Sequence, residues 1–167
     1  VTNVSWAQAL NYSKWLDNEL RNSSTTPDQL TKFLNMGGRI TLPNEAQWEK
    51  AARGTDGRIF PWGNQPSNLL ANFDNESAND VGSHACRECA NGLSDMAGNV
   101  WEMTLSPLNA YPFVSERILD TEEAQPLLVM RGGGYNDAAN NIRATVRGGV
   151  GPGSPSPVIG FRIAITK

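Results

Sequence analysis

The chain has 167 residues, a net charge of −3 and a pI near 5.1, and 39% of its residues are hydrophobic. This length is typical of a single domain, here residues 1–167, that buries its core without extra cross-links. The mildly acidic balance, without a run of Lys or Arg, excludes nucleic acid as an expected partner, and no apolar stretch reaches the ~18 residues of a membrane span.

Helix signals dominate the first third of the chain. Ser5 is a favoured cap residue, and the apolar residues after it recur at helical spacing to about Leu20. A short helix is predicted over 27–34, with proline at its first position. Asn44 caps a third helix, which Gly54 is placed to end.

A long surface loop is predicted over 55–85, where the sequence has little periodicity. Trp62 and Phe73 are its expected core anchors. A brief extended piece at 39–42 precedes the third helix, because Pro43 biases the residue before it away from helical conformation.

The last third contains three strand signals, at 127–131, 142–147 and 159–165. They predict a small antiparallel sheet. The loops between them, 132–141 and 148–158, have almost no large apolar residues. We therefore expect both loops to lie on the surface without a packing role.

The segment 91–103 joins turn-forming residues to two carboxylates, Asp95 and Glu102. With the backbone carbonyls of Gly98 and Val100 between them, these are oxygen ligands of the kind that Ca²⁺ takes from an irregular loop. The alternative is that both carboxylates accept hydrogen bonds from loop amides.

The two cysteines, Cys86 and Cys89, lie three positions apart. This is half of a zinc ribbon without a second half, so zinc is not expected even with His84 nearby. A local disulfide and two free thiols both fit the spacing.

A resemblance to a known family is carried by ordered motifs along nearly the whole chain. The motifs are VTNVSWAQALNYSKWL, TLPNEAQWEKAARG, FPWGN, LLANF, GLSDMAGNVWEM, MRGGGYN and IGFRIA. Together they resemble the formylglycine-generating enzyme, or sulfatase-modifying factor, family. The resemblance implies an α+β, variant C-type lectin-like fold with a small twisted antiparallel sheet, two or three helices and much irregular loop. It also implies an N-terminal stretch, before the first helix, that this chain is expected to lack.

The family's catalytic residues are not matched. Active members use two cysteines between the RGG and GFR motifs to bind copper and oxidise a substrate cysteine, and 131–162 contains no cysteine here. A sister branch makes sulfoxides with iron held by a histidine cluster, which one His cannot supply. We expect no catalytic residues, no copper and no enzyme activity.

One calcium site of the family is matched by Asp95, Gly98, Val100 and Glu102, the middle two through backbone oxygen. A second site is matched only at its start, by Asn72 and Phe73. A structural Ca²⁺ at the first site is the cofactor that the resemblance implies.

A narrower resemblance covers the segment 131–163, RGGGYNDAANNIRATVRGGVGPGSPSPVIGFRI. It looks like the variable region of proteins diversified by diversity-generating retroelements, which copy a template with errors at adenines. Asn codons changed in this way give many of the residue types found here. The expected variable, ligand-binding positions are Tyr135, Asn136, Asp137, Thr145, Gly148, Gly149, Val150, Gly151, Ser154, Ser156 and Val158. The alternative is a plain Gly/Pro/Ser surface tail.

The resemblances together predict a non-catalytic, receptor-type binding protein, displayed on a cell or virus particle, whose ligand is a protein or other surface ligand. Tyr135, the only aromatic residue of the two loops, is the expected anchor. The alternatives are a non-catalytic accessory module of the same family and, less favoured, an oxidase.

Overall fold

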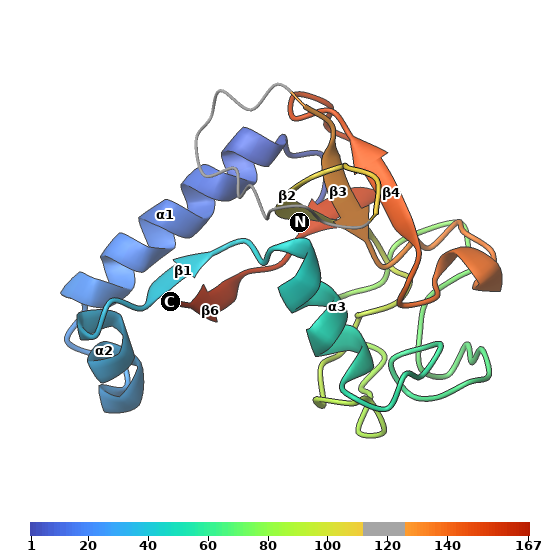
Figure 1. The fold of residues 1–167 in the computed structure, drawn as a ribbon, viewed down its shortest axis with the longest axis horizontal. Helices are drawn as coiled ribbons and strands as arrows, with labels where there is room; N and C mark the ends of the chain where they lie inside the picture. Colours follow the sequence, from blue (N-terminus) through green and yellow to red (C-terminus); the bar gives the residue numbers. More distant parts are fainter. Residues whose placement is uncertain (112–125) are drawn as a thin grey trace.

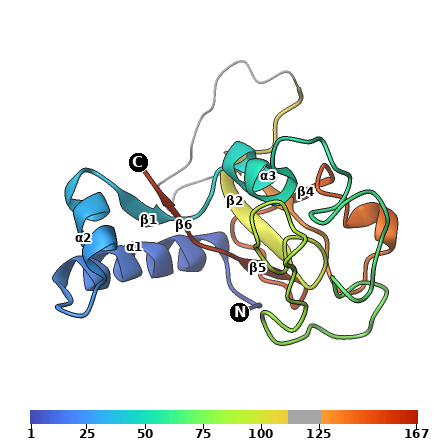
Figure 2. The same cartoon turned by 90° about the horizontal axis from the view of Figure 1, so that it is seen from below.

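The computed structural model describes residues 1–111 and 126–167. Figures 1 and 2 show α1, α2 and a two-stranded sheet projecting to one side of a second, larger sheet, with α3 and long loops on the other side. The helices are α1 (Trp6–Asn22), α2 (Asp28–Asn35), α3 (Glu45–Arg53) and the 3₁₀ turn η1 (Ala139–Asn141). The strands are β1 (Arg39–Thr41), β2 (Trp101–Pro107), β3 (Leu128–Arg131), β4 (Arg147–Val150), β5 (Ile159–Phe161) and β6 (Ala164–Thr166).

The three predicted helices are confirmed, and side-chain caps explain where α1 and α3 begin. The Ser5 hydroxyl accepts a hydrogen bond from the Gln8 amide at 3.2 Å, which satisfies an otherwise unpaired N–H at the start of α1. Asn44 caps α3 in the same way. Gly54 follows α3 with φ +65°, a conformation that favours glycine. Pro27 lies just before α2 rather than at its first position.

The larger sheet has the strand order β4-β3-β2-β5, and its β2–β5 pair is parallel. The expectation of an antiparallel sheet is therefore only partly correct. β2 was not expected, because its sequence begins inside the turn-rich segment 91–103. The strand predicted at 142–147 is wrong: a turn occupies most of that range, and β4 begins at its last residue. The signal at 159–165 divides into β5 and β6.

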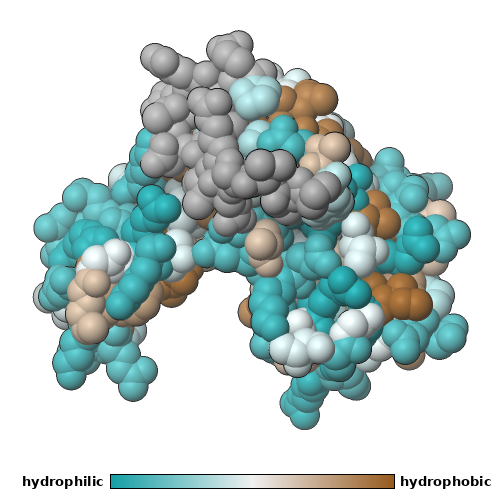
Figure 3. Space-filling model, in the orientation of Figure 1, coloured by the Kyte–Doolittle hydropathy of each residue, from teal (hydrophilic) through white to brown (hydrophobic). Residues whose placement is uncertain are grey.

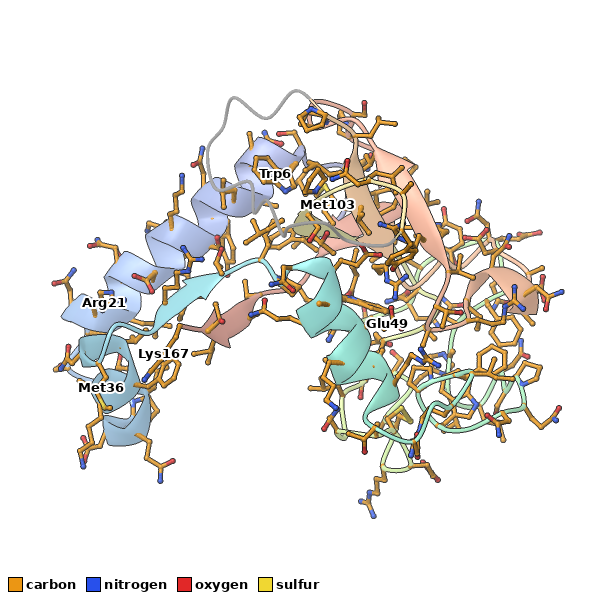
Figure 4. All side chains as sticks on the ribbon, in the orientation of Figure 1. Trp6, Arg21, Met36, Glu49, Met103 and Lys167 are labelled. Carbon is orange, nitrogen blue, oxygen red and sulfur yellow. A yellow bond between two sulfur atoms is a disulfide. The ribbon has the colours of Figure 1, made fainter. Side chains whose placement is uncertain are left out.

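The main core lies where α1 packs on one face of this sheet. Trp6 is fully buried and donates from its indole nitrogen to the carbonyl oxygen of Thr104 at 3.0 Å. Figure 4 shows Trp6 beside Met103 at this junction. In the long loop, Phe73 is buried as predicted, whereas Trp62 is partly exposed and stacks on Phe60.

The face shown in Figure 3 is mostly hydrophilic, with small separate hydrophobic areas. Within the described parts of the chain, no helix has the length and hydrophobicity to cross a membrane.

Candidate functional site

A buried ionic framework lies beneath the segment that resembles a variable region. Arg131, at the end of β3, is fully buried. Its guanidinium donates to the Glu49 carboxylate at 2.6 Å and to the carbonyl oxygens of residues 144, 145 and 146 at 2.8–3.0 Å. Figure 4 shows Glu49 on α3. A side chain of the core thus fixes the turn that leads into β4.

Charge pairing keeps this framework stable although it is buried. Burial lowers the pKa of Arg131, and the carboxylates of Glu49 and Glu45 act in the opposite direction. The Glu45 side chain is only 1% exposed and accepts two hydrogen bonds from Arg147, at 2.5 and 2.8 Å. Burial alone would lower the pKa of Arg147, but Glu45 raises it overall. Both arginines therefore stay charged.

The loop after β3 presents part of the predicted contact surface. The Tyr135 side chain is half-buried and Asn136 is exposed. The Tyr135 amide donates to the carbonyl oxygen of Asn99 at 2.8 Å, and its own carbonyl accepts from the Asn75 amide at 2.8 Å. These bonds fix the backbone at Tyr135 while leaving its side chain to the solvent side. The exposed residues 74–76 adjoin this loop, a neighbour that nothing in the sequence pattern indicated.

Asp137 holds the same loop onto β2. Its Oδ2 accepts from the Trp101 indole at 2.7 Å and from the Gly134 amide at 2.8 Å, and its Oδ1 accepts from Asn141 at 3.2 Å. All of its side-chain contacts are thus within the fold. These bonds give Asp137 a positioning role within the loop, and its contact with a ligand stays a prediction.

The expectation that these loops have no packing role needs further correction at β4. Val150 is 4% exposed and belongs to the main core, against which Val158 also packs. Gly148 faces Met130, and a Cβ at that position would lie 2.6 Å from the methionine methyl carbon. These residues lie inward because β4 pairs with β3. The sequence did not predict this strand, because two of its four residues are glycines, which are rare in strands.

The remaining predicted positions form two groups in the sequence, one before and one after β4. Tyr135, Asn136 and Thr145 precede the strand, and Thr145 is exposed. Gly151, Ser154 and Ser156 follow it, and Gly149 is exposed within it. The second group is attached to the N-terminal segment, where the amides of Asn3 and Trp6 donate to carbonyls of the 151–158 loop at 3.0 Å.

Three of the four predicted calcium residues line a cavity of about 320 Å³, and Gly98 is not among its lining residues. Asp95, Val100 and Glu102 all border it. However, both carboxylate oxygens of Glu102 accept hydrogen bonds from Arg162 at 2.6 Å, and one also accepts from the Trp48 indole at 2.5 Å.

The other carboxylate of the cavity is also engaged. The Asp95 Oδ2 accepts from the Gly82 amide at 2.7 Å. Burial alone would lower the pKa of Arg162, but Glu102 raises it overall. The cavity could hold a cation near Asp95, whereas a cation at Glu102 would have to displace Arg162 or share the carboxylate with it. The geometry thus fits hydrogen-bonded carboxylates better than a complete calcium site.

Cys86 and Cys89 form a disulfide, which decides between the two alternatives that their spacing left open. Among the described residues, no group of three or more His, Cys, Asp or Glu side chains is placed to share a metal ion.

Comparisons with known proteins agree with this architecture. The model of the sulfatase-modifying factor enzyme 1-like domain matches residues 1–167. The chain is 32% identical to inactive C-alpha-formylglycine-generating enzyme 2 of Bos taurus, over 98% of this chain and 49% of that protein. It is 34% identical to hercynine oxygenase of Mycolicibacterium smegmatis, over 64% of this chain and 28% of that protein.

Among solved structures, Treponema denticola variable protein 1 superposes with a TM-score of 0.76 at 22% identity, covering 99% of this chain and 70% of that one. PvdO from Pseudomonas aeruginosa gives 0.74 at 23% identity, covering 100% of this chain and 62% of that one. The match spans about half the length of the bovine relative and 28% of the length of the mycobacterial one. From the full-length family match and the shared fold, the chain belongs to the sulfatase-modifying factor family and has its variant C-type lectin-like fold.

Proposed function

We propose that this protein is a non-catalytic binding protein whose C-terminal segment is diversified by a retroelement. The observation that carries the proposal is that Tyr135 and Asn136 combine side chains at the surface with a fixed backbone. Their side chains reach the surface, while the backbone of the segment is held by the buried Arg131 and the partly buried Asp137. A backbone fixed from inside tolerates changes in its outward side chains.

The similar proteins support this proposal at the level of the fold. One structure of the same fold is named a variable protein, and one relative is named an inactive enzyme. Another relative is named an oxygenase, so an enzyme remains the competing class. The lack of a cysteine between residues 131 and 162 argues against the copper-dependent oxidase chemistry. A non-catalytic accessory module is the third candidate.

The proposed partner is a protein or another ligand on a surface that this protein can reach. We accordingly propose display on a cell or a virus particle, since a diversified binder has to meet its ligand. The exposed groups on both sides of β4 would provide the contacts, with Tyr135 as the aromatic anchor.

The decisive experiment compares the coding region of residues 131–163 across a population of the source organism. Under this proposal a near-copy of the segment lies close by, next to a reverse transcriptase gene, and differs from the coding copy only where the near-copy has adenines. An invariant segment without such a template would leave the accessory module as the better interpretation.

Replacing Tyr135 by Ala should weaken ligand binding by about tenfold or more, because an aromatic anchor is lost. The melting temperature should change little, since the bonds that fix residue 135 come from its backbone. A ligand for the measurement can be selected from a panel of cell-surface proteins. Unchanged affinity together with a large fall in melting temperature would place Tyr135 in the core.

We also propose that the cavity at Asp95 binds Ca²⁺, with the carbonyl of Val100, which lines the same cavity, as a further ligand. If so, excess chelator lowers the melting temperature and added Ca²⁺, but not Mg²⁺, restores it. Identical melting curves with and without chelator would leave the Glu102–Arg162 ion pair as the whole role of this site.

A further inference from the structure

A small cavity between α1 and β1 has no part in the proposed ligand binding or in the proposed Ca²⁺ site. It has a volume of about 230 Å³, and none of the predicted variable or calcium residues borders it. Figure 1 shows α1 and β1 side by side in the part of the molecule that projects away from the larger sheet. The cavity is lined by Leu10, Lys14, Asp17, Arg39, Ile40 and Thr41.

Arg39 is the unusual residue of this cavity. It is half-buried, and its Nε is buried without a hydrogen-bond partner. In contrast, the nearby Arg21 donates to the Asp17 carboxylate and to the carbonyl oxygens of Leu34 and Gly38. A buried Nε–H without an acceptor is costly, because burial removes its hydration and no protein group replaces the water.

The carboxylate of the cavity is already engaged. Asp17 accepts from the Arg21 Nε at 2.7 Å and from the Ile40 amide at 2.7 Å. Burial alone would raise the pKa of Asp17, but these two donors lower it overall, so the group is ionised and its charge is balanced by Arg21. Lys14, one turn before Asp17 on α1, adds a second cation. The cavity therefore has an excess of positive charge.

We propose that this cavity binds a carboxylate carried on a short aliphatic stem. A planar guanidinium donates two parallel hydrogen bonds to a carboxylate, and Lys14 adds a charge at the rim. Leu10 and Ile40 provide an apolar wall for the stem. A glutamate side chain of a partner protein and a free short-chain acid share this chemistry. The inference does not depend on whether the C-terminal segment is diversified.

Propionate titrated into the ¹⁵N-labelled protein, at constant pH and ionic strength, tests the proposal. We expect saturable shifts of the Arg39 Nε–Hε and Ile40 amide signals. The Ile40 shift should vanish in Arg39→Met, which keeps the aliphatic stem, and both shifts should persist in Arg87→Met, which removes an exposed arginine. A short peptide with one Glu and blocked ends separates the two sources: tighter binding than propionate indicates a protein partner, and weaker binding indicates a free acid.

Three results would overturn the proposal. One is a non-saturable response to propionate, or an equal response in Arg39→Met. Another is saturable binding of inorganic phosphate without any of propionate, which would assign the cavity to a different anion. The third is a large fall in melting temperature for Arg39→Met, since removing a buried Nε–H that has no acceptor should cost little stability.

Discussion

Replacing Arg131 by Met is expected to lower the free energy of unfolding by about 3–5 kcal/mol, the cost of breaking one side of a buried charge pair. The change leaves the carbonyl oxygens of residues 144–146 without their donor and the Glu49 carboxylate without its closest cation. Urea denaturation followed by circular dichroism measures the loss.

Arg143→Met is the matched control for this substitution. Arg143 lies close by, is exposed, and donates only to the carbonyl oxygen of Asn140 in the described contacts. Its replacement should change the free energy of unfolding by no more than about 0.5 kcal/mol. If the two variants were equally stable, the turn at 144–146 would not depend on Arg131.

Replacing Glu102 by Ala should also be severe, with a loss of about 3–5 kcal/mol. It leaves the Arg162 guanidinium without a carboxylate and the buried Trp48 indole N–H without an acceptor. Glu102 lies on β2 and Arg162 directly follows β5, so their ion pair links the two strands. Amide hydrogen exchange should therefore become faster on β2 and β5.

Glu19→Ala provides the comparison, because Glu19 is an exposed glutamate on α1. Both variants lose one negative charge, so only the loss of specific contacts separates them. The chelator experiment should be repeated on Glu102→Ala: a melting temperature that still falls with chelator would show that Ca²⁺ binds without this residue.

Local signals predicted α1 and α3 well because each of these two helices begins at a side chain that caps it. Ser5 and Asn44 can be recognised as caps from four residues of sequence. Strands depend on partners that are distant in the chain, and this explains the two main errors. β4 contains two adjacent glycines and becomes a strand only by pairing with β3, and β2 begins directly after a series of turns.

The site was predictable to a similar, partial extent. Tyr135 and Asn136 reach the surface as expected from the loop composition. The inward positions of Asp137 and Val150 could not be predicted, because short polar or small apolar residues in a Gly-rich segment look alike whether they face the solvent or the core. The carboxylates of Asp95 and Glu102 were identified, but their partner Arg162 lies 60 positions after Glu102.

The inward-facing residues of β4 also limit the repertoire that a diversification system could draw from this segment. At a position with a packing or positioning role, such as Val150 or Asp137, nearly all replacements would disturb the fold. Such a position therefore adds almost nothing to the number of variants that still fold. Variants at these positions would mostly be eliminated by misfolding before any ligand was tested. If the segment is diversified, the variants that fold would therefore differ mainly at the few outward side chains before and after β4. They should differ more in side-chain chemistry than in backbone shape.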